Sequence, residues 1–138
     1  MSRVIILLIT IAASLSAERI VYFGLDEQRG ESVVSDTITG AIKNAQWVTG
    51  KKNGALSFNG IDAHVALLLP REYVSITMAA WVKPVSVPTK LPMSAVGRPG
   101  FHQALEYWPN KKFAFSVFDK DNKQYVLYSD EYEPNEWH

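Results

Sequence analysis

Short apolar runs alternate with clusters of Gly, Pro, Asn and Asp along most of this chain. Such runs have the length of β-strands, and the residues between them are those that form tight turns. No strong helical period occurs after the first seventeen residues. The sequence therefore predicts an all-β protein. The expected strands are residues 20–25, 46–49, 55–58, 63–67, 75–83, 93–96, 102–107, 112–118 and 124–128.

Two of these segments are predicted to lie inside a sheet. SITMAAWVK, residues 75–83, and KFAFSVF, residues 112–118, place apolar side chains on both faces of a strand. A strand that is apolar on both faces usually has neighbours on both sides. The DKDN sequence at 119–122 has the composition of a hairpin turn, so 112–118 and 124–128 are expected to pair.

The N-terminal segment predicts export. Residues 1–17, MSRVIILLITIAASLSA, place Arg3 before an apolar run that ends in small residues. This is the arrangement of a secretory signal peptide, and the run is short for a membrane span. Cleavage after Ser16 and cleavage after Ala17 both remain open, as does an uncleaved N-terminal anchor. The expected location is secreted or at the cell surface, in an extracellular or periplasmic space, with no membrane attachment after cleavage.

Composition narrows the classes of partner. The chain has 138 residues, with 14 Lys and Arg against 14 Asp and Glu, and no cysteine. A near-neutral charge argues against partners held by bulk electrostatics, such as nucleic acid or an anionic membrane. An exported chain without cysteine must be stabilised by packing, or by a metal, rather than by disulfides. Its length suits a single hydrophobic core.

An ordered set of short motifs resembles one family. GKKNGALSFNGID at 50–62, AAWVKP at 79–84 and WH at 137–138 follow one another in the order seen in laminin-G-like domains of the concanavalin A-like lectin/glucanase superfamily. The resemblance covers nearly all of residues 18–138. It implies a jelly-roll β-sandwich of two antiparallel sheets. Within the first motif, Asp62 is expected to hydrogen-bond the backbone of its own turn.

The resemblance also implies a calcium site and an unfinished domain. The family often places calcium in the loop that corresponds to SDTITGAIKNA, residues 35–45, which keeps Asp36 and Gly40 but few other loop residues. Asp26, Asp36 and the carbonyl region of Thr39 are the candidate ligands, since calcium prefers oxygen donors. Solvated loop acids are the alternative. In the family, more β-structure follows the Trp-His pair, so 18–138 is expected to be a sandwich domain truncated at its C-terminus.

The sequence contains one candidate pair of catalytic carboxyls. Glycosidases of this fold need two carboxyls about 5 Å apart, and Glu131 and Glu133 would share one face of a strand. The sequence around them lacks the acidic strand of the laminarinase-type enzymes, and Pro134 favours a loop. His64, His102 and His138 have no metal-ligand spacing. We expect no catalytic residue, although a fragment of a glycoside hydrolase remains the alternative.

Exposed aromatic residues are the remaining functional lead, because sugar rings stack on them. The candidate ligand-binding residues are Tyr107, Trp108, Tyr128 and Arg98, of which Arg98 would suit an acidic sugar. The sequence thus predicts a secreted, non-catalytic recognition or adhesion module within a larger extracellular protein. Its partner is expected to be a glycan or an extracellular protein. A purely structural sandwich spacer is a further alternative, since this fold hosts several functions.

Overall fold

The computed structural model describes residues 21–36, 38–68, 77–97 and 103–138. These residues form nine β-strands and no helix, which confirms the all-β prediction. All strand pairs are antiparallel, and they form three sheets in the orders β1-β2-β5, β3-β4 and β6-β7-β8-β9. The strands are β1 (Ser32–Val34), β2 (Thr39–Lys43), β3 (Gln46–Thr49), β4 (Gly54–Ser57), β5 (His64–Ala66), β6 (Met93–Gly97), β7 (Gln103–Tyr107), β8 (Lys112–Phe118) and β9 (Gln124–Glu131).

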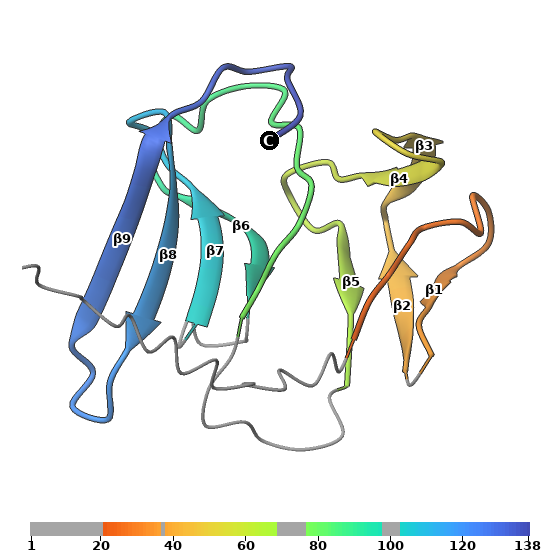
Figure 1. Ribbon diagram of the computed structural model, residues 1–138, viewed down its shortest axis with the longest axis horizontal. Coiled ribbons are helices and arrows are strands. Elements are labelled where there is room, and N and C mark those ends of the chain that lie inside the picture. The colour runs from red at the N-terminus through yellow and green to blue at the C-terminus, as the bar shows by residue number, and fades with distance from the viewer. Residues whose placement is uncertain (1–20, 37, 69–76, 98–102) are drawn as a thin grey trace, which may run out of the picture.

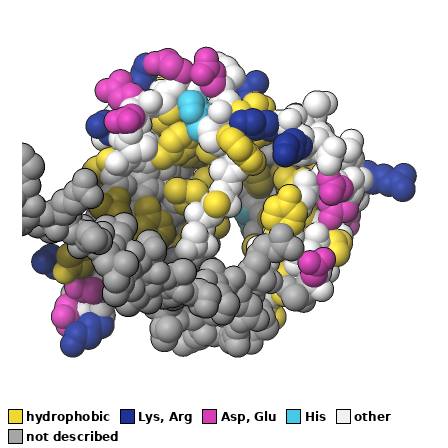
Figure 2. Space-filling view, viewed as in Figure 1, with side chains coloured by type: hydrophobic (Ala, Val, Ile, Leu, Met, Phe, Trp, Pro, Cys, Tyr) yellow, Lys and Arg dark blue, Asp and Glu magenta, His cyan; other side chains and the backbone are white. Residues whose placement is uncertain are grey.

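The arrangement is consistent with a β-sandwich. The four-stranded sheet lies on one side of the molecule, and β1, β2 and β5 lie on the other, with β3 and β4 beside them (Figure 1). On the face shown in Figure 2, hydrophobic side chains line the recess between the two groups of strands, and charged side chains gather along the upper rim. Two continuous sheets were expected, whereas the described residues form three separate hydrogen-bonded sheets.

The four-stranded sheet is a meander of consecutive hairpins. Its β8–β9 turn is fixed by Asp119, whose Oδ1 accepts hydrogen bonds from the backbone N–H groups of Asp121 and Lys123, each at 2.9 Å. Asn122 adopts a left-handed φ of 60°, a conformation that Asn tolerates well. The DKDN sequence therefore forms the predicted hairpin turn. The order along the sheet places β9 at one edge, with β8 as its only neighbour among the described strands.

The three-stranded sheet contains two strands that the sequence did not predict, β1 and β2. Buried Gly40 allows the strands to approach closely, because a Cβ at this position would lie 2.5 Å from Leu67 Cδ2 and 2.8 Å from Val33 Cγ2. Glycine weakens a strand pattern when the sequence is read alone. Here the same glycine makes room for the side chains that cover β2.

The turn before β5 differs in one detail from the sequence expectation. Asn59, rather than Asp62, bonds the turn backbone: its Oδ1 accepts from the N–H groups of Ile61, Asp62 and Ala63. The Asp62 carboxylate instead accepts the side-chain amides of Asn44 at 2.6 Å and Asn59 at 2.8 Å. These two amides lower the pKa of Asp62 below its ordinary value of 3.8. The stretch at 53–67 is thus a structural unit held by amide and carboxylate groups.

Two expected strands are not strands where the structure describes them. Residues 21–25 and 77–83 have no strand pairing, and the rest of each predicted segment lies outside the described residues. In the second segment, only Val82 is paired: it exchanges two backbone hydrogen bonds with His138, at 3.0 and 2.9 Å. Trp81 is 62 % exposed, and the Lys51 ammonium lies 3.2 Å from the centre of its ring. The prediction of a mid-sheet strand is therefore wrong for 77–83.

The densest aromatic packing surrounds Tyr132, which follows β9 and is buried. Its ring lies 4.8 Å from that of Phe113 and 6.5 Å from that of Tyr107, measured between centroids. The ring of His138 lies 5.9 Å away. This group covers one face of the four-stranded sheet at the end where β9 finishes. The opposite face of the same sheet carries the candidate site.

Candidate functional site

The register of β7, β8 and β9 brings three residues into one row across the sheet. Glu106 lies opposite Ala114, and Ala114 lies opposite Tyr128. In the adjacent row, Ser116 lies opposite Ala104 on one side and Val126 on the other. Paired residues of neighbouring strands point to the same face. Glu106, Ser116 and Tyr128 therefore share a face on which two alanines leave room around the carboxylate.

Trp108 completes this group, which we call the Glu106 cluster: Glu106, Trp108, Ser116 and Tyr128. The Trp108 Nε1–H donates to Glu106 Oε2 at 3.1 Å, and the Ser116 hydroxyl donates to the same oxygen at 3.2 Å. The backbone of Trp108 is fixed by the β7–β8 turn, where its N–H donates to the Lys112 carbonyl at 2.9 Å. The indole is therefore oriented by both its own backbone and the carboxylate.

The Glu106 carboxylate is buried without a positive partner. Glu106 is 4 % exposed and Ser116 is 0 % exposed. Among the described residues, Glu106 is bonded by neutral donors alone, and both of these reach Oε2. Glutamate is rarely this buried unless it is paired, because removing a charge from water is costly. A carboxylate in this setting attracts any cation or hydroxyl donor that reaches it.

Two aromatic rings border the carboxylate. The rings of Trp108 and Tyr128 meet edge to face, with centroids 5.3 Å apart and an interplanar angle of 87°. Trp108 is half-buried, whereas Tyr128 is 47 % exposed. Contacts of this geometry add stability beyond the area they bury, so they restrict both side chains. Trp108 and Tyr128 therefore form a fixed aromatic surface, open to solvent, beside a buried carboxylate.

The structure brings together two of the four ligand-binding residues expected from the sequence, Trp108 and Tyr128. Tyr107 lies on the opposite face, where its hydroxyl donates to the sulfur of Met93 at 3.5 Å and where burial raises the pKa of its phenol. Arg98 lies outside the described residues. Sequence reasoning missed Glu106, although the alternation in LEYW places it on the same side as Trp108.

The expected calcium ligands lie in different surroundings. The Asp26 carboxylate accepts a hydrogen bond from the Asn53 amide. Asp36 lies in the turn between β1 and β2, and Thr39 begins β2 opposite Val34. No three His, Cys, Asp or Glu side chains of the described residues form a group that could hold a metal ion. Calcium binding by Asp26, Asp36 and the carbonyl region of Thr39 remains a prediction.

A hollow lies beside β3, away from the Glu106 cluster. It has a volume of about 230 Å³ and is lined by Gln28, Trp47, Val48 and Thr49. The Trp47 Nε1–H donates to the Gly30 carbonyl at 2.9 Å, which fixes the indole against the loop before β1. The lining contains no charged side chain, so the hollow offers polar contacts but no group for acid or base chemistry.

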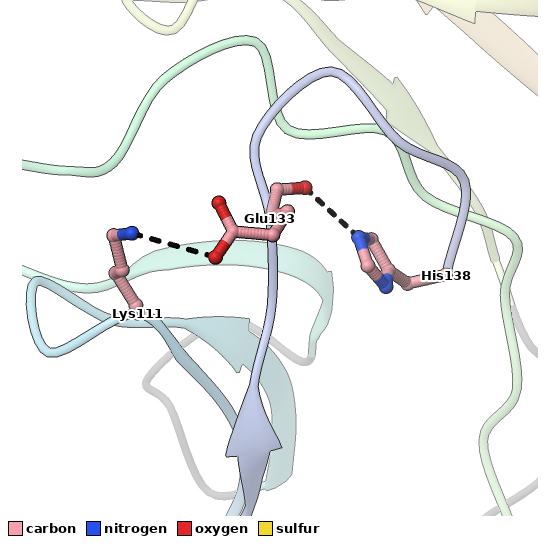
Figure 3. Close-up of polar contacts among 3 residues, drawn as sticks. All are labelled: Lys111, Glu133 and His138. Carbon is pink, nitrogen blue, oxygen red and sulfur yellow. Dashed lines mark hydrogen bonds and ion pairs between the residues drawn. The ribbon is translucent and has the colours of Figure 1, made fainter.

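The two carboxylates considered for glycoside hydrolysis lie at the surface. Glu133 is exposed and forms an ion pair with Lys111 at 3.7 Å, while its backbone carbonyl lies 3.0 Å from the Nε2 of His138 (Figure 3). Glu131 ends β9 opposite Lys112 and is also exposed. A glycosidase acid works in an apolar setting that favours its protonated form. Neither carboxylate has such a setting.

Neither a membrane-spanning helix among the described residues nor a similar known protein points to a function. Within the described ranges, we find no helix with the length and apolar character that a membrane crossing requires. Comparisons of the chain with protein-family models, curated proteins and solved structures find no match. The chemistry of the Glu106 cluster is therefore the basis for a function of this chain.

Proposed function

We propose that this chain is a secreted, non-catalytic carbohydrate-recognition module with a laminin-G-like jelly-roll fold. The observation that carries the proposal is the Glu106 cluster, in which the exposed ring of Tyr128 meets the oriented indole of Trp108 beside a carboxylate. Sugar rings present C–H groups that pack on aromatic faces and hydroxyls that donate to carboxylates. The all-β scaffold holds these groups on neighbouring strands, which restricts their motion.

The non-catalytic part of the proposal follows from the positions of the acids. Glu106 is the one carboxylate of the cluster, whereas glycosidases of either stereochemistry use two. Glu131 and Glu133 are exposed, and Glu133 is paired with Lys111. Export and the location outside the cell depend on the signal-like segment at 1–17. Calcium, if bound near Asp26, Asp36 and Thr39, would serve the fold or the ligand rather than hydrolysis.

The test is retention on a panel of polysaccharides combined with an assay for released reducing sugar. We expect retention on at least one glycan without release of sugar. Trp108→Ala and Tyr128→Ala should each weaken binding about tenfold, since each removes one stacking ring. Tyr125→Ala is the matched control, because Tyr125 is similarly exposed on β9 but lies opposite Val117 on the other face of the sheet.

Each contrary outcome identifies a different function. No retention of the folded chain on any glycan would overturn the proposal in favour of a structural spacer or a protein-binding module. Sugar release that is lost in Glu131→Gln or Glu133→Gln would instead support the glycoside hydrolase alternative. Equal losses in Tyr128→Ala and Tyr125→Ala would show that the Glu106 face is not the binding face.

A further inference from the structure

The charge of the Glu106 cluster suggests which glycans it accepts. Glu106 is the one charged side chain of the cluster, and the two groups bonded to it, the Trp108 indole and the Ser116 hydroxyl, are neutral. Glu106 is 4 % exposed, so water screens the charge of its carboxylate weakly. An anionic ligand would be repelled at this position, whereas a cationic ligand would supply the missing positive charge.

The hydrogen bond between Trp108 and Glu106 strengthens this preference. An indole N–H that donates to a carboxylate is polarised, and the electron density of the ring rises as a result. Cations bind the faces of aromatic rings because those faces carry negative potential, and tryptophan is the strongest of these rings. Tyr128 adds a second ring at 5.3 Å. Both rings therefore favour a positively charged group near the carboxylate.

We propose that the Glu106 cluster selects glycans that carry free amino groups, the deacetylated amino sugars, over N-acetylated, neutral and acidic glycans. This inference rests on the proposed carbohydrate-binding function and names the ligand class for the same site. The protonated amine lies at the Trp108 and Tyr128 rings, where it experiences the Glu106 charge. The sugar ring packs on the remaining aromatic surface.

The experiment compares soluble oligosaccharides of equal length by calorimetry and by tryptophan fluorescence. The probes are oligomers of glucosamine, of N-acetylglucosamine, of glucose and of galacturonic acid, at a pH at which the amine is protonated. We expect the glucosamine oligomer to bind at least about tenfold more tightly than the other three. The galacturonic acid oligomer should bind most weakly.

Two variants separate the site from general electrostatics. Glu106→Gln keeps an acceptor for Trp108 and Ser116 but removes the charge, so it should lower glucosamine affinity about tenfold more than it lowers glucose affinity. Glu131→Gln removes the same charge from an exposed position at the end of β9 and should change neither. Circular dichroism and a melting curve establish that each variant is folded. If Glu106→Gln does not fold, Tyr128→Phe, which keeps the ring, and Tyr128→Ala, which removes it, test the contact between the amine and the ring instead. Tyr128→Ala should then lower glucosamine affinity more than glucose affinity, and an equal loss for the two oligomers overturns the selectivity.

The outcomes distinguish this inference from the function on which it depends. Equal affinity for the glucosamine and glucose oligomers, or tighter binding of the acidic oligomer, overturns the amino-sugar selectivity but leaves carbohydrate recognition standing. An equal loss of glucosamine affinity in Glu106→Gln and Glu131→Gln overturns it as well, because the attraction is then a bulk effect. Absence of binding to any oligomer or polysaccharide contradicts the proposed function itself.

Discussion

At the scale of single residues, Ser116 illustrates how the candidate site and the stability of the sheet depend on each other. Its hydroxyl is fully buried and donates to Glu106. Removing one donor leaves a buried carboxylate with a single hydrogen bond. We expect Ser116→Ala to lower the free energy of unfolding by about 1–3 kcal/mol. Urea unfolding checks this, and a loss below about 0.5 kcal/mol would mean that water replaces the hydroxyl.

Asp62 gives a prediction about acid stability. The amides of Asn59 and Asn44 lower its pKa below 3.8, so the folded state binds fewer protons at Asp62 than the unfolded state does. The resulting stability is present above the unfolded pKa and is lost as the pH falls through the folded pKa. Asn44→Gly removes one amide while suiting the left-handed φ of 54°.

We therefore expect Asn44→Gly to raise the pKa of Asp62 toward 3.8 and to flatten the loss of stability below that pH. Carboxyl NMR titration reports the pKa, and urea unfolding at several acidic pH values reports the stability. Because the carboxylate is exposed, the direction of the change is the prediction. An unchanged titration of Asp62 would contradict the role assigned to the Asn44 amide.

Some residues of the Glu106 cluster could be predicted from the sequence, and others could not. Trp108 was predictable because it follows the end of a strand, and Tyr128 because alternate side chains of a strand point to opposite faces of the sheet. Their proximity was not, because it depends on the β8–β9 register that places Tyr128 opposite Ala114. From the sequence alone, Glu106 would be expected to be exposed, as most glutamates are. Its burial becomes evident only when the strands are assembled.

At the scale of strands and turns, the sequence predicted those elements that are determined by residues close together in the chain. The bounds of β3 and β8 agree with the sequence expectation, since both strands have regular patterns and defined turns. β2 was missed because Gly40 interrupts its pattern, and because β5, one of its two partners, is distant in sequence. Residues 77–83 were predicted as a strand because they are apolar, yet Val82 alone is paired there. Strand propensity does not tell which distant segments of a chain pair with each other.

Gly40 provides the test of packing at this scale. A Cβ would lie 2.5, 2.7 and 2.8 Å from side-chain atoms of Leu67, Val65 and Val33. We expect Gly40→Ala to lower the free energy of unfolding by about 1–3 kcal/mol, because three side chains must move. Gly97→Ala in β6 is the control: its Cβ would lie 3.4 Å from that of Ala104, and its effect should stay within about 0.5 kcal/mol. Equal losses in urea unfolding would show that the β1-β2-β5 packing is not the cause.

At the scale of the whole molecule, the described residues expose many large apolar side chains. Leu127 is 74 % exposed on β9, and Trp81, Val85 and Leu91 are 62 %, 75 % and 75 % exposed. β9 has eight residues and one hydrogen-bonded neighbour in the sheet of described strands. Apolar patches and unpaired strand edges both recruit other chains. The exposure of these side chains and the edge position of β9 among the described strands therefore favour self-association.

We therefore predict that the purified chain self-associates as its concentration rises, with the edge of β9 as the contact. Leu127→Lys should shift the population toward monomer, because a charge on an edge strand opposes pairing with a second strand. Ile61→Lys is the matched control: Ile61 is 90 % exposed, but it lies in the turn before β5. Size-exclusion chromatography with light scattering measures the effect. A parent chain that is monomeric at every concentration would contradict the prediction. An equal response of the two variants would show that β9 is not the contact, because lysine would then act through solubility alone.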